Sequence, residues 1–290
     1  MDLLQLRYFC EIAKQESVSK AASILHVSQP SLSKSLSTLE RDLGIKLFDR
    51  IGKSIVLNHH GKLVYEEMSQ ALNLITNLQL KLQDTDIAYG DIKLLILAAT
   101  KIMPNLLLDF YMKYPNINIH VKQAATFNLQ QACDYDFVIS ATPGKYNHLD
   151  NVLLLDEDIV LAVNKDHHLA NRKSISLSET ADESFITYSV GPSIRTLTDN
   201  LCLQAGFAPN ILLECETPSN YRNFIQSGLA VCLLPYQTQY SLFSSDLIPI
   251  HLNDPVCKRK LFLSYPKGKY LNTAMVIFQK FCLEYFKKLN

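Results

Sequence analysis

The chain has 290 residues, with 28 Lys and Arg against 28 Asp and Glu, and 48% of its residues are hydrophobic. This length is too great for one comfortable hydrophobic core, so it predicts two or three domains, and the apolar fraction excludes wholesale disorder. The balanced charge excludes a protein that is basic over its whole surface, although a local basic patch remains compatible with it. No apolar run approaches the roughly 20 residues of a membrane span, so we expect no membrane partner.

The cysteines and the N-terminal segment bear on the cellular compartment. Seven cysteines are scattered along the chain without a CxxC pair. An odd number without regular spacing favours reduced thiols over a disulfide framework. The first 15 residues mix acidic and basic side chains and lack the order of a secretion signal. We therefore expect a cytoplasmic protein.

Residues 1–58 predict a helix-turn-helix followed by a wing. Ser19 is expected to cap a helix that runs through Leu25, and Ser28 to cap a second helix with Pro30 in its first turn. Leu32, Leu36 and Leu39 then face inward, and polar side chains face outward. Such a second helix fits the major groove of DNA, which is about 12 Å wide.

Candidate DNA contacts follow from that placement. Gln and Lys reach base edges, small serines allow close approach, and basic residues of the wing at 44–57 meet phosphates or the minor groove. The alternative is a small helical domain whose charges are merely solvated. The expected contacts with double-stranded DNA are Ser28, Gln29, Pro30, Ser31, Ser33, Lys34, Ser37, Arg50 and Lys53.

Residues 59–89 predict one long linker helix, because the stretch lacks Pro and has Gly only near its start. Apolar residues spaced alternately by four and three form a seam that favours a partner helix. The alternative is an amphipathic helix that lies on its own domain. We expect the dimer seam to contain Val64, Met68, Ala71, Ile75, Leu78 and Leu82.

Residues 90–290 alternate between strand-like and helix-like stretches, which predicts an α/β domain with parallel sheets and right-handed crossovers. The length accommodates two lobes, one at about 90–160 and 266–290 and the other at about 161–265. Small molecules bind such domains where strands end. Hydroxyls and helix N-termini there suit an anionic effector, although they also serve as ordinary caps. The candidate effector residues are Thr100, Lys101, Thr126, Phe127, Ser193, Arg195 and Thr217.

A long ungapped stretch resembles the LysR-type transcriptional regulators. Residues 6–50 read LRYFCEIAKQESVSKAASILHVSQPSLSKSLSTLERDLGIKLFDR, and weaker similarity continues at 156–170, 204–210 and 224–235. The resemblance implies a winged helix-turn-helix, a dimerising linker helix and a two-lobed effector domain similar to periplasmic binding proteins. It further implies a homodimer that assembles into a homotetramer and a small effector in the cleft between the lobes.

Other kinds of site have less support. Nucleophile-elbow, phosphate-loop, dinucleotide-binding and zinc-protease motifs are all missing, so we expect neither an enzyme nor a cofactor. The adjacent pairs His59–His60 and His167–His168 lack metal-ligand spacing, so no metal site is expected. Cys202 and Cys215 leave redox sensing open as an alternative function. A second alternative is a small-molecule-binding α/β protein with an incidental helical domain.

Overall fold

The computed structural model describes residues 2–51, 54–83, 88–124, 134–141, 149–188, 194–215 and 223–289. The chain divides into two compact units, which we take in turn. The first contains residues 1–86 with the short pieces 128–133 and 266–272, and the second contains 87–127, 134–265 and 273–290. Within the described residues, no helix is both long enough and apolar enough to span a membrane.

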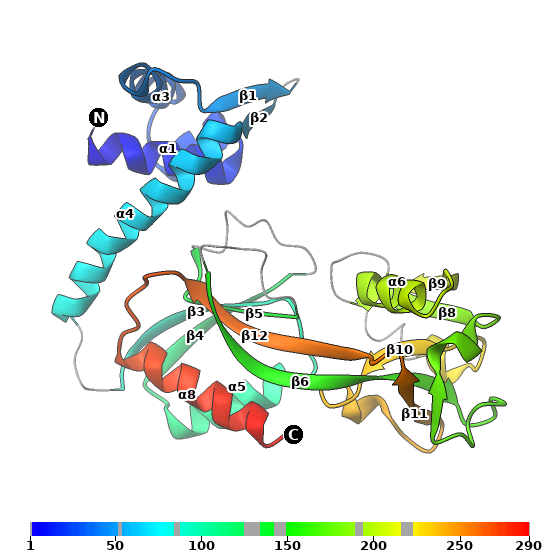
Figure 1. Ribbon diagram of the computed structural model, residues 1–290. Coiled ribbons are helices and arrows are strands. Elements are labelled where there is room, and N and C mark those ends of the chain that lie inside the picture. The colour runs from blue at the N-terminus through cyan, green and yellow to red at the C-terminus, as the bar shows by residue number, and fades with distance from the viewer. Residues whose placement is uncertain are drawn as a thin grey trace. The chain divides into compact units, whose positions relative to one another are not determined.

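The first unit has the predicted winged helix-turn-helix fold (Figure 1). Its helices are α1 (Leu3–Gln15), α2 (Val18–Ile24) and α3 (Gln29–Leu43), and the wing consists of β1 (Phe48–Ile51) paired antiparallel with β2 (Ser54–Leu57). Phe9, Leu39 and Leu47 are among the residues of its buried core. The predicted cap Ser19 is wrong: Ser17 caps α2, and its side chain accepts a hydrogen bond from the N–H of Lys20.

The linker helix α4 begins at His59 and ends at Gln83, which is shorter than predicted, because residues 88 and 89 are not helical. Asn58 lies just before it and accepts a hydrogen bond from the N–H of Gly61 at 2.8 Å, so its side chain caps the helix. The Asn58 side-chain amide also donates to the carbonyl of Lys46 at 2.9 Å. One side chain therefore fastens the start of α4 to the segment that precedes the wing.

The second unit contains a mixed eight-stranded sheet with the order β4-β3-β5-β12-β6-β11-β7, and β10 also pairs with β6. Two long strands, β6 (Leu149–Asn164) and β12 (Lys258–Pro266), run through both lobes (Figure 1). The remaining strands of this sheet are β3 (Gly90–Ile96), β4 (Ile117–Gln123), β5 (Phe137–Ser140), β7 (Ser174–Ser176), β10 (Cys232–Pro235) and β11 (Leu247–Asp254).

The prediction of purely parallel sheets is wrong. β3 runs parallel to β4 and β5, but β5 pairs antiparallel with β12, and both β10 and β11 pair antiparallel with β6. The antiparallel pairs arise where the long strands return through the sheet. The sequence pattern does not indicate β7 or β11, because each is short or weakly apolar.

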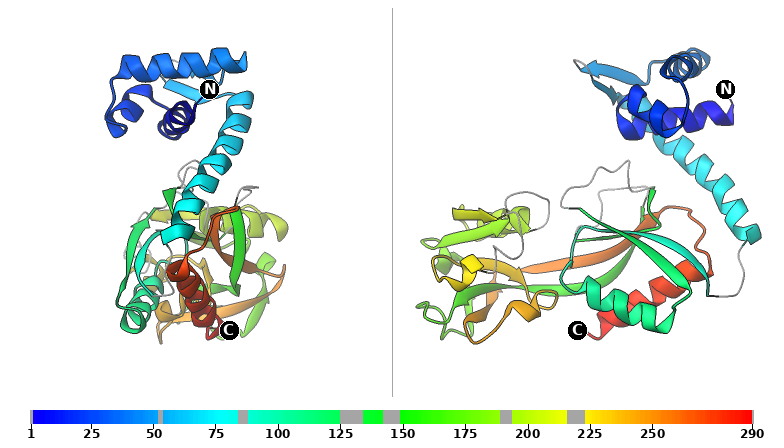
Figure 2. Two further views of the ribbon diagram at one scale, coloured as in Figure 1. Left: turned by 90° about the vertical axis from the view of Figure 1, so that its left-hand side faces the viewer. Right: turned by 180° about the vertical axis from the view of Figure 1, so that it is seen from behind.

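Helices cover the first lobe and the second lobe differently (Figure 2). In the first, α5 (Met103–Lys113) and α8 (Thr273–Lys287) lie side by side, and Phe110 and Phe278 meet edge to face with ring centroids 5.1 Å apart. In the second, α6 (Ile194–Gln204) packs near the parallel pair β8 (Ser184–Tyr188) and β9 (Asn210–Cys215). Each lobe therefore has its own hydrophobic core.

A buried ion pair joins the two long strands. Glu157 on β6 accepts hydrogen bonds from Arg259 on β12 at 2.9 and 2.6 Å. Thr238, in the segment after β10, donates to the same carboxylate from its backbone N–H and from its hydroxyl. All three residues are buried, so this network fixes the point where β6, β12 and the loop after β10 meet.

Candidate nucleic-acid interface and effector site

The outward face of α3 is assembled by local rules. Ser28 caps the helix by accepting a hydrogen bond from the N–H of Ser31, and Pro30 occupies the first turn. Leu32 and Leu39 are fully buried, which turns the opposite side of the helix to solvent. On that side Ser28, Gln29, Pro30, Ser31, Lys34 and Ser37 are exposed, whereas Ser33 is half-buried.

A buried carboxylate orients the wing relative to α3. Glu40, near the end of α3, accepts hydrogen bonds from the N–H of Leu47 at 3.0 Å and from the ammonium of Lys46 at 2.6 Å. Gly44 ends the helix with a φ of 71°, in the left-handed region that favours glycine. Sequence reasoning missed Glu40, since a buried Glu in an exposed-looking helix end gives no periodic signal.

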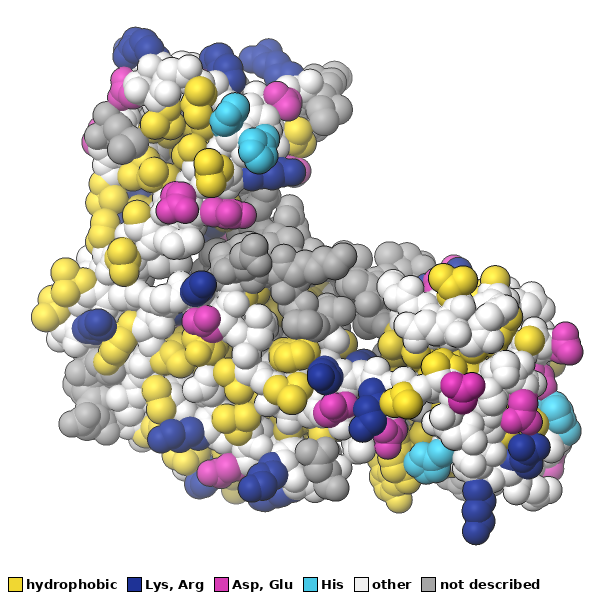
Figure 3. Space-filling model, in the orientation of Figure 1, with side chains coloured by type: hydrophobic (Ala, Val, Ile, Leu, Met, Phe, Trp, Pro, Cys, Tyr) yellow, Lys and Arg dark blue, Asp and Glu magenta, His cyan; other side chains and the backbone are white. Residues whose placement is uncertain are grey.

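Two basic side chains of this interface are free to meet an anion. Lys34 and Arg50 are exposed, and neither has an ion-pair partner within the part of the chain that the structure describes. Lys and Arg side chains gather over the edge of the domain formed by α3 and the wing (Figure 3). The predicted contact Lys53 lies outside the described residues.

The first half of the predicted seam serves the domain's own core. Val64 and Met68 are half-buried and pack against the cluster that contains Phe9 and Leu39. For these two residues the alternative interpretation, a helix lying on its own domain, therefore describes the contacts. Gly61 shows how close this contact is, because a Cβ placed there would lie 1.9 Å from the carbonyl oxygen of Leu47.

The second half of the seam is exposed. Ile75, Leu78 and Leu82 are 38%, 59% and 78% exposed, and hydrophobic side chains line an outer edge of α4 (Figure 3). Asn77, which lies roughly 200° around the helix from Ile75 at 3.6 residues per turn, makes contacts of its own. Its side chain donates to the carbonyl of Gly268 at 2.7 Å and accepts from the N–H of Tyr270 at 2.8 Å. The 268–270 segment thus covers a different face of α4 from the one that carries Ile75.

In the effector domain, Thr100 and Lys101 follow β3 and precede α5. Thr100 is half-buried and Lys101 is exposed. The preceding residue, Ala99, is buried and adopts a φ of 58°, a left-handed conformation that is uncommon for alanine. The N-cap residue of α5, Ile102, makes no side-chain capping bond. Backbone donors at the start of α5 therefore lie beside a strained turn and two polar side chains.

Arg195 forms ion pairs with two carboxylates. Its guanidinium binds both oxygens of Asp199 at 3.0 and 2.8 Å and also contacts Glu214 on β9. Bonding to Asp199 raises the pKa of Arg195, so the residue keeps its charge but shares it with two carboxylates. The other predicted effector residues, Thr126, Phe127, Ser193 and Thr217, lie outside the described residues.

The two thiols considered for redox sensing are buried. Cys202 lies in α6 and Cys215 at the end of β9. Burial, reinforced by the Asp199 carboxylate, raises the pKa of Cys202 to about 12, and burial also raises the pKa of Cys215. Thiolate is the reactive form, so both groups are poor nucleophiles at neutral pH.

The fold and the interface define a winged helix-turn-helix regulator with a separate effector domain, and the comparisons agree. Residues 3–62 match the bacterial regulatory helix-turn-helix model of the lysR family, and residues 92–287 match the LysR substrate binding domain. The chain belongs to the LysR family of bacterial transcriptional regulators.

Individual relatives span its full length. The HTH-type transcriptional regulator YybE of Bacillus subtilis is 31% identical over 294 residues, which cover 99% of this chain and 100% of the relative. The transcriptional dual regulator GltC of the same organism is 29% identical, with coverage of 100% and 99%. A full-length OxyR variant from Pseudomonas aeruginosa shares the fold, with a TM-score of 0.74, 20% identity and coverage of 99% and 95%. The relatives are transcriptional regulators, in keeping with a function other than catalysis.

The thiol environments lead to a prediction about peroxide. Cys202→Ser and Cys215→Ser variants should bind operator DNA like the parent protein, with and without hydrogen peroxide, because neither thiol forms appreciable thiolate at pH 7. Operator affinity measured by fluorescence anisotropy before and after peroxide treatment checks this. A peroxide response that disappears in either single variant would establish redox sensing instead.

Proposed function

We propose that this LysR-type regulator binds double-stranded promoter DNA through α3 and the wing, as a homo-oligomer joined through α4, and responds to a small effector. The division of labour follows the predicted domains: 1–58 for DNA, 59–89 for dimerisation and 90–290 for the effector. The observation that carries the proposal is the outward face of α3, where Gln29 and Lys34 are exposed next to serines while Leu32 and Leu39 fill the core. Such a regulator acts in the cytoplasm, where the promoter is.

Replacing single side chains of α3 and the wing tests the DNA interface. Lys34→Ala should weaken binding to the cognate operator by about 1–3 kcal/mol and flatten base preference at one position, because a base contact is lost. Arg50→Ala should instead weaken binding to all DNA sequences alike, because a phosphate contact is lost. The slope of log affinity against log salt concentration should fall by about one. Titrations on operator and scrambled duplexes at several salt concentrations separate the two effects.

Lys122→Ala is the matched control for those variants. Lys122 is an exposed lysine on β4 in the second unit, so its removal changes the net charge equally without touching α3. We expect its operator affinity and salt slope to equal those of the parent. If the base preference of Lys34→Ala is unchanged, Lys34 does not contact a base in the major groove.

We place the effector at the carboxyl end of β3, where Thr100, Lys101 and the start of α5 adjoin. The support is the strained turn at Ala99 and the absence of a side-chain cap on α5, since anions are stabilised by unpaired N–H groups and by a lysine. Arg195 contributes less than its charge suggests, because Asp199 and Glu214 already neutralise it. We therefore propose a small carboxylate or other anion as effector.

A thermal-shift screen with small mono- and dicarboxylates tests that proposal. A bound anion should raise Tm by mass action, and Thr100→Val should reduce the shift because a hydroxyl donor is lost with little change in volume. Thr76→Val, the same substitution on α4, should leave the shift intact. A shift of equal size in Thr100→Val and in the parent would place the anion elsewhere.

A further inference from the structure

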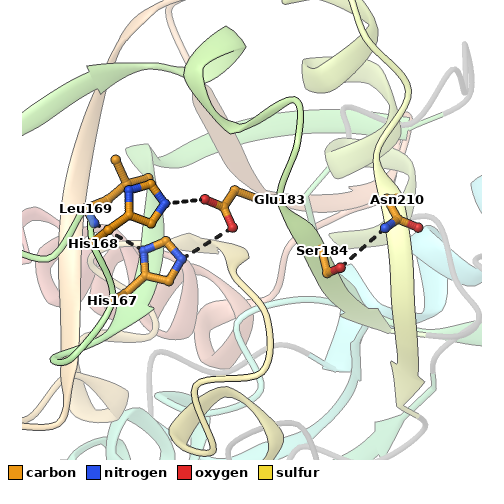
Figure 4. Close-up of polar contacts among 6 residues, drawn as sticks. All are labelled: His167, His168, Leu169, Glu183, Ser184 and Asn210. Atoms are coloured by element: carbon orange, nitrogen blue, oxygen red, sulfur yellow. Dashed lines mark hydrogen bonds and ion pairs between the residues drawn. The ribbon is translucent and has the colours of Figure 1, made fainter.

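A histidine–carboxylate cluster lies in the second lobe and takes no part in the proposed effector site. His167 and His168 occupy the turn after β6, and Glu183 directly precedes β8. The Nε2 atom of His168 lies 2.6 Å from one oxygen of Glu183, and Nε2 of His167 lies 3.4 Å from the other (Figure 4). One carboxylate therefore joins two imidazoles that come from a segment 15 to 16 residues away.

The spacing of these groups suits a single cation. One ligand atom from each residue lies within 4.8 Å of the other two. Ligands that share a Zn²⁺ ion at about 2.0–2.2 Å are themselves roughly 3–4 Å apart, so small side-chain rotations would bring all three to one ion. The His168 side chain is 67% exposed, whereas those of His167 and Glu183 are 13% and 22% exposed. The site is thus partly preformed and open to solvent on one side.

The backbone around the cluster is held in place. Leu169 directly follows His168, Phe185 lies two residues after Glu183, and both belong to the same hydrophobic core. The Asn164 side chain accepts a bond from the N–H of Asp166 at 2.9 Å and donates to the carbonyl of Gln226 at 2.7 Å, which fixes the turn. Asn210 donates to Ser184 at 3.3 Å and ties the start of β8 to β9 (Figure 4). Supported ligands of this kind bind metals more tightly than ligands on loose loops.

One contact favours the metal-free form. The N–H of Leu169 donates to Nδ1 of His167 at 3.3 Å, so the proton of that neutral imidazole sits on Nε2 and faces Glu183. A metal at Nε2 requires the other tautomer, with the proton on Nδ1, and the loss of this long hydrogen bond. Glu183 and His168 are therefore the leading ligands, and His167 joins at a cost in affinity.

We propose that His167, His168 and Glu183 form a binding site for a divalent transition metal of the Zn²⁺ type. Two imidazoles and a carboxylate suit Zn²⁺, Ni²⁺ and Cu²⁺ better than Mg²⁺ or Ca²⁺, which prefer all-oxygen ligands. Sequence spacing alone did not suggest this site, because the third ligand follows an intervening strand, β7. Solvent completes the coordination as it does at other sites with three protein ligands.

Calorimetric titration of the full-length protein with Zn²⁺ alone tests the proposal. We expect saturable binding of one ion per chain and a rise in Tm. Glu183→Gln and His168→Ala should each weaken the Kd by at least about tenfold, since even loss of a supporting residue has an effect of that size. His168 is exposed, so its replacement should leave the fold intact, which circular dichroism verifies.

The chain supplies a matched control. His59 and His60 are also adjacent and exposed, with ring centroids 5.8 Å apart, but within the described residues they form no group of three with a carboxylate or thiol. A His59→Ala/His60→Ala double variant should bind Zn²⁺ like the parent, and Mg²⁺ should not compete. A Zn²⁺ Kd that is unchanged by both Glu183→Gln and His168→Ala overturns the proposal, as does the absence of binding at millimolar Zn²⁺.

Discussion

Replacing Arg259 by Met is expected to destabilise the second unit by about 3–5 kcal/mol, because it leaves the Glu157 carboxylate buried without its cation. Glu157 is fully buried, and among the residues that the structure describes it would keep only the N–H and hydroxyl of Thr238 as donors. Met approximates the length of the arginine stem, so the decrease in stability reflects the lost charge more than the lost volume. Hydrogen exchange of β6 and β12 peptides across a urea series measures the local free energy of unfolding.

Arg172→Met is the control for this prediction. Arg172 pairs with Glu179 in the same lobe at 3.3 Å, but both side chains are about half exposed. Exposed pairs contribute about 0–1 kcal/mol, so this variant should be nearly neutral. Adding Glu157→Gln to Arg259→Met should recover part of the loss, since no unpaired charge then remains. If Arg259→Met and Arg172→Met destabilise the protein equally, burial does not make the Glu157–Arg259 pair more important than an exposed pair.

The second large effect is expected from Ile75→Asp, which should dissociate the oligomer. If a partner helix covers Ile75, Leu78 and Leu82, the new carboxylate is buried without a cation, and such a charge costs several kcal/mol. Light scattering at micromolar concentration should then give a smaller mass, and operator affinity should fall because two linked DNA-binding domains act together.

Gln70→Asp adds the same charge to the same helix as a control. Gln70 is exposed and lies roughly 140° from Ile75 around α4, away from the seam. Its mass and operator affinity should match those of the parent. An unchanged mass in Ile75→Asp would mean that the exposed apolar edge of α4 is not the dimer interface.

Sequence patterns predicted the elements whose burial follows a local period. The inward-facing Leu32 and Leu39 indicated α3, and the apolar run at 92–99 overlaps β3 at residues 92–96. The direction of each strand relative to its neighbours could not be predicted from the sequence. It depends on how the long strands β6 and β12 run through the sheet, and the apolar pattern of one strand does not show which strand pairs with it. The cap of α2 was misassigned because Ser17 and Ser19 are both good caps, and the burial of Ala21 and Ala22 selects the register.

The candidate sites divide in the same way. Exposure of Gln29 and Lys34 followed from helical geometry, whereas Glu40, Asn77 and Glu183 depend on partners from other segments. Arg195 lies between the two cases. Its partner Asp199, four residues along the same helix, was readable as an ion pair from spacing alone, but Glu214 on β9 was not.

The close seating of α4 on the wing domain has a consequence for the operator. Gly61 lies against the Leu47 carbonyl, Asn58 ties the helix start to Lys46, and Val64 and Met68 pack against the core, so these contacts set the direction in which α4 leaves the domain. Two chains joined along α4 would then hold their recognition helices at a set separation and rotation. DNA repeats about every 10.5 base pairs, so inserting about half a repeat between the half-sites turns one of them to the far side of the duplex. In a dimer joined in this way, the fixed start of α4 would therefore require the two half-sites of the promoter to keep a set spacing along the helical repeat of DNA.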